Sequence, residues 1–211
     1  MAGISWYVAL ASVIWAIVLL TIQLLMAWGG GRPDHSAPTG RRSRGILYNF
    51  TAAMLPSHKE SARHHPAEFL IGSVLHVGVL LGVLGFGITL VSPQQAPILP
   101  VVTGVILGIS LLAGAVLLVR RLVSPNLKAM SSPDDFIAIV VTGGFLALSI
   151  LFAFERVAVA TYFAWSSVLF FYLPLGKLRH CIFFFAARSD LGGRLGYRGT
   201  FPAQPKQGST R

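Results

Sequence analysis

The sequence contains very little cysteine and little charge. Its single cysteine, Cys181, excludes an intrachain disulfide and excludes a zinc or iron–sulfur cluster held by this chain alone. Only 11% of the 211 residues are charged, whereas 54% are hydrophobic, and the mean hydropathy is +0.70. A soluble domain of this length does not bury so much apolar surface, so the composition is typical of a membrane protein.

Five apolar runs of the sequence are each long enough to cross a bilayer. A hydrocarbon core about 30 Å thick needs about 20 mainly apolar residues per helix, and backbone groups in lipid have to be hydrogen-bonded within the chain. The sequence therefore predicts an all-α integral membrane protein, a bundle of five transmembrane helices within residues 1–188. The helices are predicted at about residues 4–28, 68–91, 98–119, 136–154 and 160–186. Pro174 should kink the last of them, because proline lacks the backbone N–H.

The polar remainder forms a loop at residues 29–66 and a tail at residues 189–211. Within the loop, Ile46–Leu55 is a candidate for a short helix at the membrane interface, although Asn49 weakens its apolar face. The tail is rich in glycine and arginine, so we expect it to need a partner or lipid to become ordered. The first apolar run is expected to be a retained helix and not a signal peptide, because no Lys or Arg precedes it.

The formal net charge of +10 lies almost entirely on one side of the predicted bundle. Sixteen of the 17 basic residues fall in the first loop, in the loop between the third and fourth helices, or at the end of the last helix and in the tail, and only Arg156 falls on the opposite side. Because Lys and Arg are enriched in cytoplasmic loops, this pattern predicts an N-terminus outside and a C-terminus in the cytoplasm. The same charges attract anionic membrane lipid, and we expect no nucleic-acid partner.

Two histidines lie within predicted spans, His76 in the second helix and His180 in the fifth. His76 is about nine residues from its cytoplasmic helix end and His180 about seven, so at about 1.5 Å per residue both imidazoles are expected at nearly the same depth in the inner leaflet. Ionisable residues inside a span are functional candidates. Two imidazoles from facing helices suit a six-coordinate haem iron, which serves electron transfer. Alternatively, each histidine hydrogen-bonds a neighbouring helix, or the two contact each other.

Several other residues are candidates for the haem environment. Gly72, one turn from His76, would leave room for the face of the porphyrin. Basic side chains at the predicted cytoplasmic surface would meet the propionates, and the candidates are Arg63, Arg120, Arg121, Lys177 and Arg179. Cys181, beside His180, is interpreted as a small core residue, with a redox role as the open alternative.

Four stretches of the sequence carry a resemblance to a known family. They are Ser73-Val-Leu-His-Val-Gly-Val-Leu80, Arg120-Arg-Leu-Val-Ser-Pro-Asn-Leu-Lys128, Asp134-Asp-Phe-Ile137 and Phe170-Phe-Tyr-Leu-Pro-Leu-Gly-Lys-Leu-Arg-His180. Together they resemble the gamma (cytochrome b) subunit of respiratory nitrate reductase and its relatives, over most of the chain from about Ser73 to Arg188. The resemblance implies that His76 and His180 are the axial ligands of the iron in the haem b nearest the cytoplasmic partner.

The resemblance also exposes a departure. Relatives similar to the nitrate reductase subunit carry a second haem, and the matching ligand positions fall here at Phe86 and near Tyr162. Neither side chain is a plausible ligand of a low-spin b-type haem, so we expect one haem. This departure favours the related single-haem membrane subunits of complexes that contain heterodisulfide-reductase-like iron–sulfur proteins.

The resemblance therefore implies a membrane subunit of a respiratory oxidoreductase in a bacterial or archaeal cytoplasmic (inner) membrane. Such a subunit passes electrons between a quinone pool and a cytoplasmic iron–sulfur subunit and is not catalytic alone. Glu68, Ser73 and Lys177 are candidates to contact the quinone because they are polar and on the correct side. The basic tail and the Arg41–Arg44 cluster are expected to dock the partner.

Two other functions remain open at this point. One is a cofactor-free membrane anchor that recruits a soluble complex. The other is a small transporter in which His76, His180 and Thr89 line a polar path, although the sequence has neither the inverted repeats nor the broken helices with charges at the midplane that favour that function.

Overall fold

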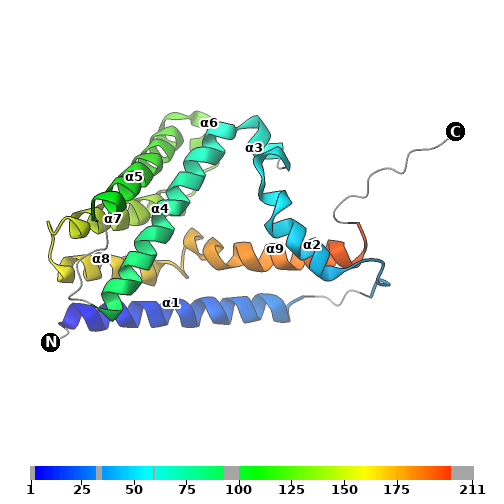
Figure 1. Cartoon of the computed structure of the whole chain (residues 1–211), viewed down its shortest axis with the longest axis horizontal. Helices are drawn as coiled ribbons and strands as arrows, with labels where there is room; N and C mark the ends of the chain where they lie inside the picture. Colours follow the sequence, from blue (N-terminus) through cyan, green and yellow to red (C-terminus); the bar gives the residue numbers. More distant parts are fainter. Residues whose placement is uncertain (1–2, 32–34, 59, 93–99, 201–211) are drawn as a thin grey trace. The chain divides into compact units, whose positions relative to one another are not determined.

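The computed structural model describes residues 3–31, 35–58, 60–92 and 100–200, and within these ranges the chain is helical without a strand (Figure 1). The all-α class predicted from the sequence is therefore confirmed for these residues. The elements are α1 (Ile4–Gly29), α2 (Arg42–Phe50), η1 (Ala52–Met54), η2 (Pro56–His58), α3 (Glu60–His64), α4 (Pro66–Val91), α5 (Pro100–Val123), α6 (Pro125–Ala129), α7 (Pro133–Ala153), α8 (Val159–Tyr172), η3 (Lys177–Arg179) and α9 (His180–Tyr197).

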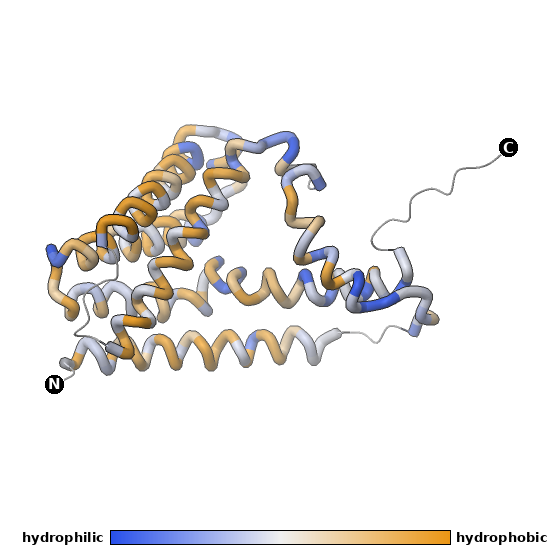
Figure 2. Tube along the Cα trace, in the orientation of Figure 1, coloured by the Kyte–Doolittle hydropathy of each residue, from blue (hydrophilic) through white to orange (hydrophobic). Residues whose placement is uncertain are grey.

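Four of these helices, α1, α4, α5 and α7, are long and apolar enough to cross a membrane, and α8 with α9 forms a broken pair that would make a fifth span. Hydrophobic residues dominate the long helices (Figure 2). Many large apolar side chains are exposed, such as Leu80 at 65% and Leu112 at 68%. Such exposure suits helices whose outer surface meets lipid tails. The structure is thus compatible with a multi-pass membrane protein.

The fifth apolar run is not one continuous helix. Helix α8 ends at Tyr172, and helical structure resumes with η3 at Lys177 and α9 at His180. The predicted kink at Pro174 is confirmed, because this buried residue lies within the break. Proline lacks the N–H that would have continued the hydrogen-bond ladder of the helix. The single helix expected at residues 160–186 is therefore replaced by two shorter ones.

The chain divides into two compact units, each of which is described by itself. The first unit comprises Met1–Thr21 and Ala67–Arg179, and the second comprises Ile22–Pro66 and His180–Arg211. The first unit thus contains most of α4 and all of α5 to η3, with the first part of α1, whereas the second contains α2, α3 and α9.

Neighbouring helices of the first unit run antiparallel. Near the start of α4, Glu68 pairs with Arg120 near the end of α5, with 2.9 Å between Oε1 and Nη2. The adjacent Arg121 pairs with Asp135 in the first turn of α7, at 3.2 Å. Because each pair joins the start of one helix to the end of another, the charged ends of α4, α5 and α7 lie at one end of this unit.

Helices α4 and α5 approach closely at Gly78. The Ser110 hydroxyl of α5 donates to the Val74 carbonyl of α4 at 2.9 Å. A Cβ on Gly78 would collide with the Ser110 side chain, so this approach requires a residue without one. Small residues at such crossings are the usual device by which membrane helices pack.

Aromatic rings fill the core of the first unit away from its charged end. Phe86, Phe145, Tyr162 and Phe163 are 2%, 0%, 2% and 1% exposed. The Tyr162 ring stacks on Phe152 with 4.6 Å between centroids and meets Phe86 edge to face at 6.1 Å. Aromatic pairs in these geometries stabilise a core beyond the area that they bury.

The second unit is held together by close backbone contact between α2 and α9. A Cβ on Gly45 of α2 would meet the carbonyl oxygen of Gly192 and would lie 2.8 Å from the Cα of Gly196. The Asn49 amide donates to the Arg188 carbonyl at 2.6 Å, and the Arg188 guanidinium donates to the Asn49 carbonyl at 2.5 Å. This order of contacts makes the two helices antiparallel, and we call the pair the α2–α9 hairpin.

The hairpin differs from what the sequence predicts for the loop and the tail. A tail without its own structure is expected from Ser189, but α9 continues to Tyr197 and packs against α2 of the same chain. Glycine weakens an isolated helix, yet here it permits the backbones to touch. The interfacial helix expected at Ile46–Leu55 is found earlier, at Arg42–Phe50. Asn49, which weakened that expectation, is buried against α9.

Candidate functional site

His76 lies on α4, a helix long and apolar enough to span a membrane, and its side chain is exposed. Its Nδ1 is 2.6 Å from the carbonyl oxygen of Gly72, one turn earlier. Because a carbonyl oxygen only accepts a hydrogen bond, this contact assigns a proton to Nδ1. Imidazole in this tautomer, oriented by a backbone carbonyl, is the form that ligates a metal.

Gly72, one turn before His76, is not packed against another of the described residues. A Cβ built on Gly72 would meet no atom within 4 Å, so this glycine borders open space. The Ser73 hydroxyl donates to the Phe69 carbonyl of its own helix at 2.8 Å. The side chain that is predicted to bind iron therefore has a suitable tautomer, and Gly72 has the open face expected of it.

His180 is the first residue of α9, and its side chain is exposed. Cys181 is also exposed, so its interpretation as a small core residue is wrong. Helix α9 buries Gly192, Gly193 and Gly196, which come later, and not its first turn.

The two histidines belong to different units, His76 to the first and His180 to the second. The expectation that they share one depth counts residues along a single fifth helix, and the break after Tyr172 removes that common axis. Lys177 already lies at the charged end of the first unit, where it contacts Asp135. A site made of both imidazoles thus stays a prediction from the sequence.

The charged end of the first unit holds the chain that leads to α9. Asp135 accepts from the Lys177 ammonium at 2.6 Å and pairs with Arg121 at 3.2 Å. The neighbouring Asp134 accepts from the backbone N–H of Lys177 at 2.8 Å and from the Tyr172 hydroxyl. Two carboxylates at the start of α7 therefore fix both the backbone and the side chain of Lys177.

Sequence reasoning missed this role of the two aspartates. From the sequence, Asp134 and Asp135 are recognised only as part of a stretch that carries the family resemblance. The available signal is the spacing from Ser132 to Asp135, which is that of a capping box. The backbone N–H of Ser132 indeed donates to the Asp135 carboxylate at 2.8 Å.

The residues predicted to surround the haem lie in both units. Arg120 is paired with Glu68, one of the candidate quinone contacts. Lys177 belongs to the aspartate cluster. Arg179 in η3 of the first unit and Arg63 in α3 of the second unit are both exposed. Of the basic candidates, Arg120, Arg121 and Lys177 are brought together at one end of the first unit.

The two positions that the sequence resemblance assigns to a second haem lie in the aromatic core. Phe86 and Tyr162 are each 2% exposed, and their rings contact one another. Phe145 and Phe152 stack on Tyr162, at 6.4 and 4.6 Å between centroids. Packed aromatic rings therefore fill the space around both positions.

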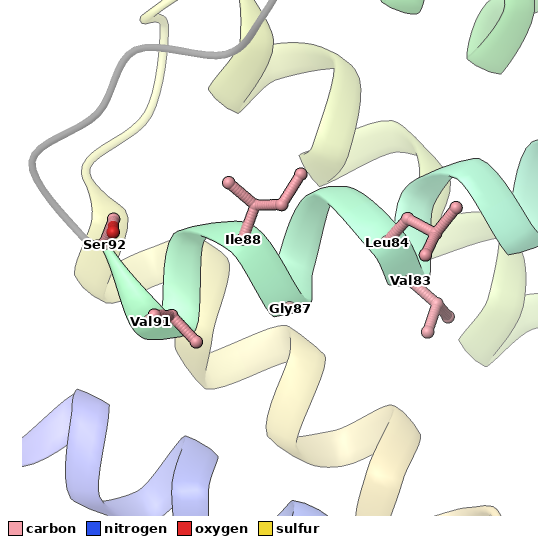
Figure 3. A pocket seen from close by; sticks show the side chains of 6 residues that line it. All are labelled: Val83, Leu84, Gly87, Ile88, Val91 and Ser92. Atoms are coloured by element: carbon pink, nitrogen blue, oxygen red, sulfur yellow. The ribbon is translucent and has the colours of Figure 1, made fainter.

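A shallow groove follows one side of α4 near its C-terminal end (Figure 3). It is lined by Val83, Leu84, Gly87, Ile88, Val91 and Ser92. Since only one lining side chain carries a polar group, the groove offers an apolar surface and not the polar contacts that a catalytic site needs.

No protein family, curated protein or solved structure matches this chain.

Proposed function

We propose that this chain is the haem b-binding membrane subunit of a respiratory oxidoreductase complex, with His76 and His180 as the axial ligands. It exchanges electrons between the quinone pool and a cytoplasmic iron–sulfur subunit, in a bacterial or archaeal cytoplasmic membrane with the N-terminus outside. The observation that carries the proposal is the hydrogen bond from His76 Nδ1 to the Gly72 carbonyl, because an imidazole that ligates a metal through Nε2 is commonly oriented in this way.

Two further features support the choice of haem. Gly72 borders open space one turn from His76, as a porphyrin face requires. His76 is an ionisable residue on a helix that is long and apolar enough to span a membrane, and such residues are candidates for a functional site. A bound haem b supplies a one-electron couple between the two-electron quinone and the iron–sulfur partner.

A single haem is supported by the aromatic core. Phe86 and Tyr162 stand at the positions of the second ligand pair, and their rings pack on each other and on Phe152. With one haem in the inner leaflet, quinone approaches from that leaflet, and electron transfer is largely electroneutral. If the purified complex in liposomes builds a membrane potential during quinone-linked turnover, this arrangement is wrong.

The charged residues have defined tasks in this proposal. The ion pair of Glu68 with Arg120 lies at the charged end of the first unit, where it contributes a polar contact for a quinone head. Asp134 and Asp135 hold Lys177, three residues before His180 in the chain. His76 is oriented by a hydrogen bond within its own helix.

The test is a reduced-minus-oxidised absorption spectrum of the purified chain, with the haem content measured by a pyridine haemochrome assay. We expect one haem b per chain, which His76→Ala and His180→Ala should each abolish. His64→Ala, which removes an exposed histidine in α3, is the matched control and should keep the haem. A folded chain without haem would leave the cofactor-free anchor as the better function.

A further inference from the structure

The α2–α9 hairpin has one strongly basic end. Because the helices are antiparallel, the start of α2 lies beside the end of α9, and the backbone of Arg41 approaches Gly196. Five arginines are clustered along the chain at this end: Arg41, Arg42, Arg44, Arg194 and Arg198. All five are exposed. Within the two segments of the hairpin, residues 41–50 and 180–198, the sequence has a single acidic residue, Asp190.

Two arginines of the basic end, Arg42 and Arg194, make defined contacts within the hairpin. The Arg42 guanidinium lies over the Tyr197 ring, 5.8 Å from its centroid. Arg194 reaches Asp190 one turn earlier, at 3.2 Å. At Gly45, Gly192 and Gly196 the backbones of the two helices contact each other directly. The hairpin therefore presents several guanidinium groups together on a short, rigid support.

The opposite end of the hairpin is aromatic. The rings of Phe50 and Phe185 stack with 6.1 Å between their centroids. Phe185 is 57% exposed and Leu47 is 65% exposed. Arg188 is used within the hairpin, where it binds Asn49 and lies 5.0 Å from the Phe184 centroid. Segments at a membrane–water interface typically carry both basic and exposed aromatic residues.

We infer that the basic end of the α2–α9 hairpin binds the headgroup phosphates of anionic phospholipid. Helix α9 follows the apolar helix α8 after a short break, and the two together form a candidate broken span that ends at the basic end of the hairpin. Basic clusters next to a membrane helix are attracted to anionic leaflets. Arginine suits phosphate in particular, because its planar fork donates two hydrogen bonds at once. An acidic protein partner is the competing occupant.

The experiment is a titration of the delipidated full-length chain in detergent with phosphatidylglycerol or phosphatidylcholine, followed by native mass spectrometry. We expect preferential binding of phosphatidylglycerol that excess glycerol 3-phosphate does not displace, which distinguishes lipid from a free phosphate ester. The double variant Arg41→Gln with Arg44→Gln should lower phosphatidylglycerol affinity about tenfold and leave phosphatidylcholine binding unchanged. The matched control, Lys128→Gln with Arg156→Gln, removes the same charge from exposed sites of the first unit and should have no effect.

Two further readouts keep the inference falsifiable. Asp190→Asn removes the only acid of the hairpin and should raise phosphatidylglycerol affinity, so this variant tests the site without weakening the fold. Equal losses in the double variant and its control, or no loss in either, would overturn the inference. So would an unchanged lipid affinity together with loss of a co-purifying acidic protein. Haem absorbance should be unaffected by these variants, so failure here is distinguishable from failure of the proposed function.

Discussion

The two units of this chain pack by opposite means. In the first unit, large rings fill the core, and Phe86, Phe145 and Tyr162 are each at most 2% exposed. In the second unit, α2 and α9 meet at Gly45 and Gly192, where side chains are absent. Packing of rings requires large side chains that fill the core, whereas close contact between backbones requires residues without a side chain. Removing atoms should therefore damage the first unit, and adding atoms should damage the second.

The largest effect is expected from Phe86→Ala. This substitution opens a cavity among Tyr162, Phe163 and Phe170, whose rings lie within 6.1 Å of the Phe86 ring. Buried Phe-to-Ala changes cost about 3–5 kcal/mol. Thermal unfolding in detergent, followed by circular dichroism, measures the loss. The control is Leu84→Ala on the same helix, because Leu84 is 65% exposed and should cost less than about 1 kcal/mol. Equal losses would mean that the rings do not form a packed core.

A smaller effect of the opposite kind is expected from Gly45→Ala. Alanine normally stabilises a helix relative to glycine, but here its Cβ would meet the backbone of Gly192 and Gly196. Overpacking of this kind costs about 1–3 kcal/mol. Hydrogen exchange of the α2 amides should accelerate accordingly.

Gly193→Ala is the matched control in the same hairpin. Its Cβ would lie 3.6 Å from the Ile46 Cδ1, which is ordinary contact, so protection of α2 should be unchanged or increased. If Gly45→Ala also leaves α2 protected, then the hairpin is not held by close backbone contact.

The long apolar helices were predictable from the sequence, and their ends show why the remainder was not. The run expected at residues 98–119 is helical from Pro100 to Val123, because Arg120 and Arg121 continue the helix beyond its apolar part. Three long helices begin at a proline, a signal that an apolar window does not use. The α2–α9 hairpin was missed because its packing depends on glycines, which count against a helix when each segment is considered alone.

The candidate site was predictable in residue type but not in geometry. A histidine in an apolar run identifies His76 as a functional candidate, and the glycine one turn earlier is visible as well. The tautomer of His76 depends on its rotamer, which brings Nδ1 to the Gly72 carbonyl, and no sequence pattern encodes that rotamer. Lys177 contacts Asp134 and Asp135, which lie 43 and 42 positions before it in the sequence. Only the folded chain brings them together.

The smallest effect is expected from removing an ion pair, and it should be larger in the first unit than in the second. Asp135→Asn keeps the size of a side chain that is only 13% exposed but removes the charge that holds Lys177 and Arg121. We expect a loss of about 1 kcal/mol, because hydrogen bonds to charged groups are strengthened by partial burial but both cations retain access to solvent. Asp190→Asn in the second unit is the control, since the Asp190 side chain is 59% exposed and its pair with Arg194 should contribute less than about 0.5 kcal/mol. Hydrogen exchange at residues 133–138 should rise only in the first variant. Were the two substitutions to cost the same, the charged end of the first unit would be an ordinary solvated surface, and its aspartates would not hold the chain before α9.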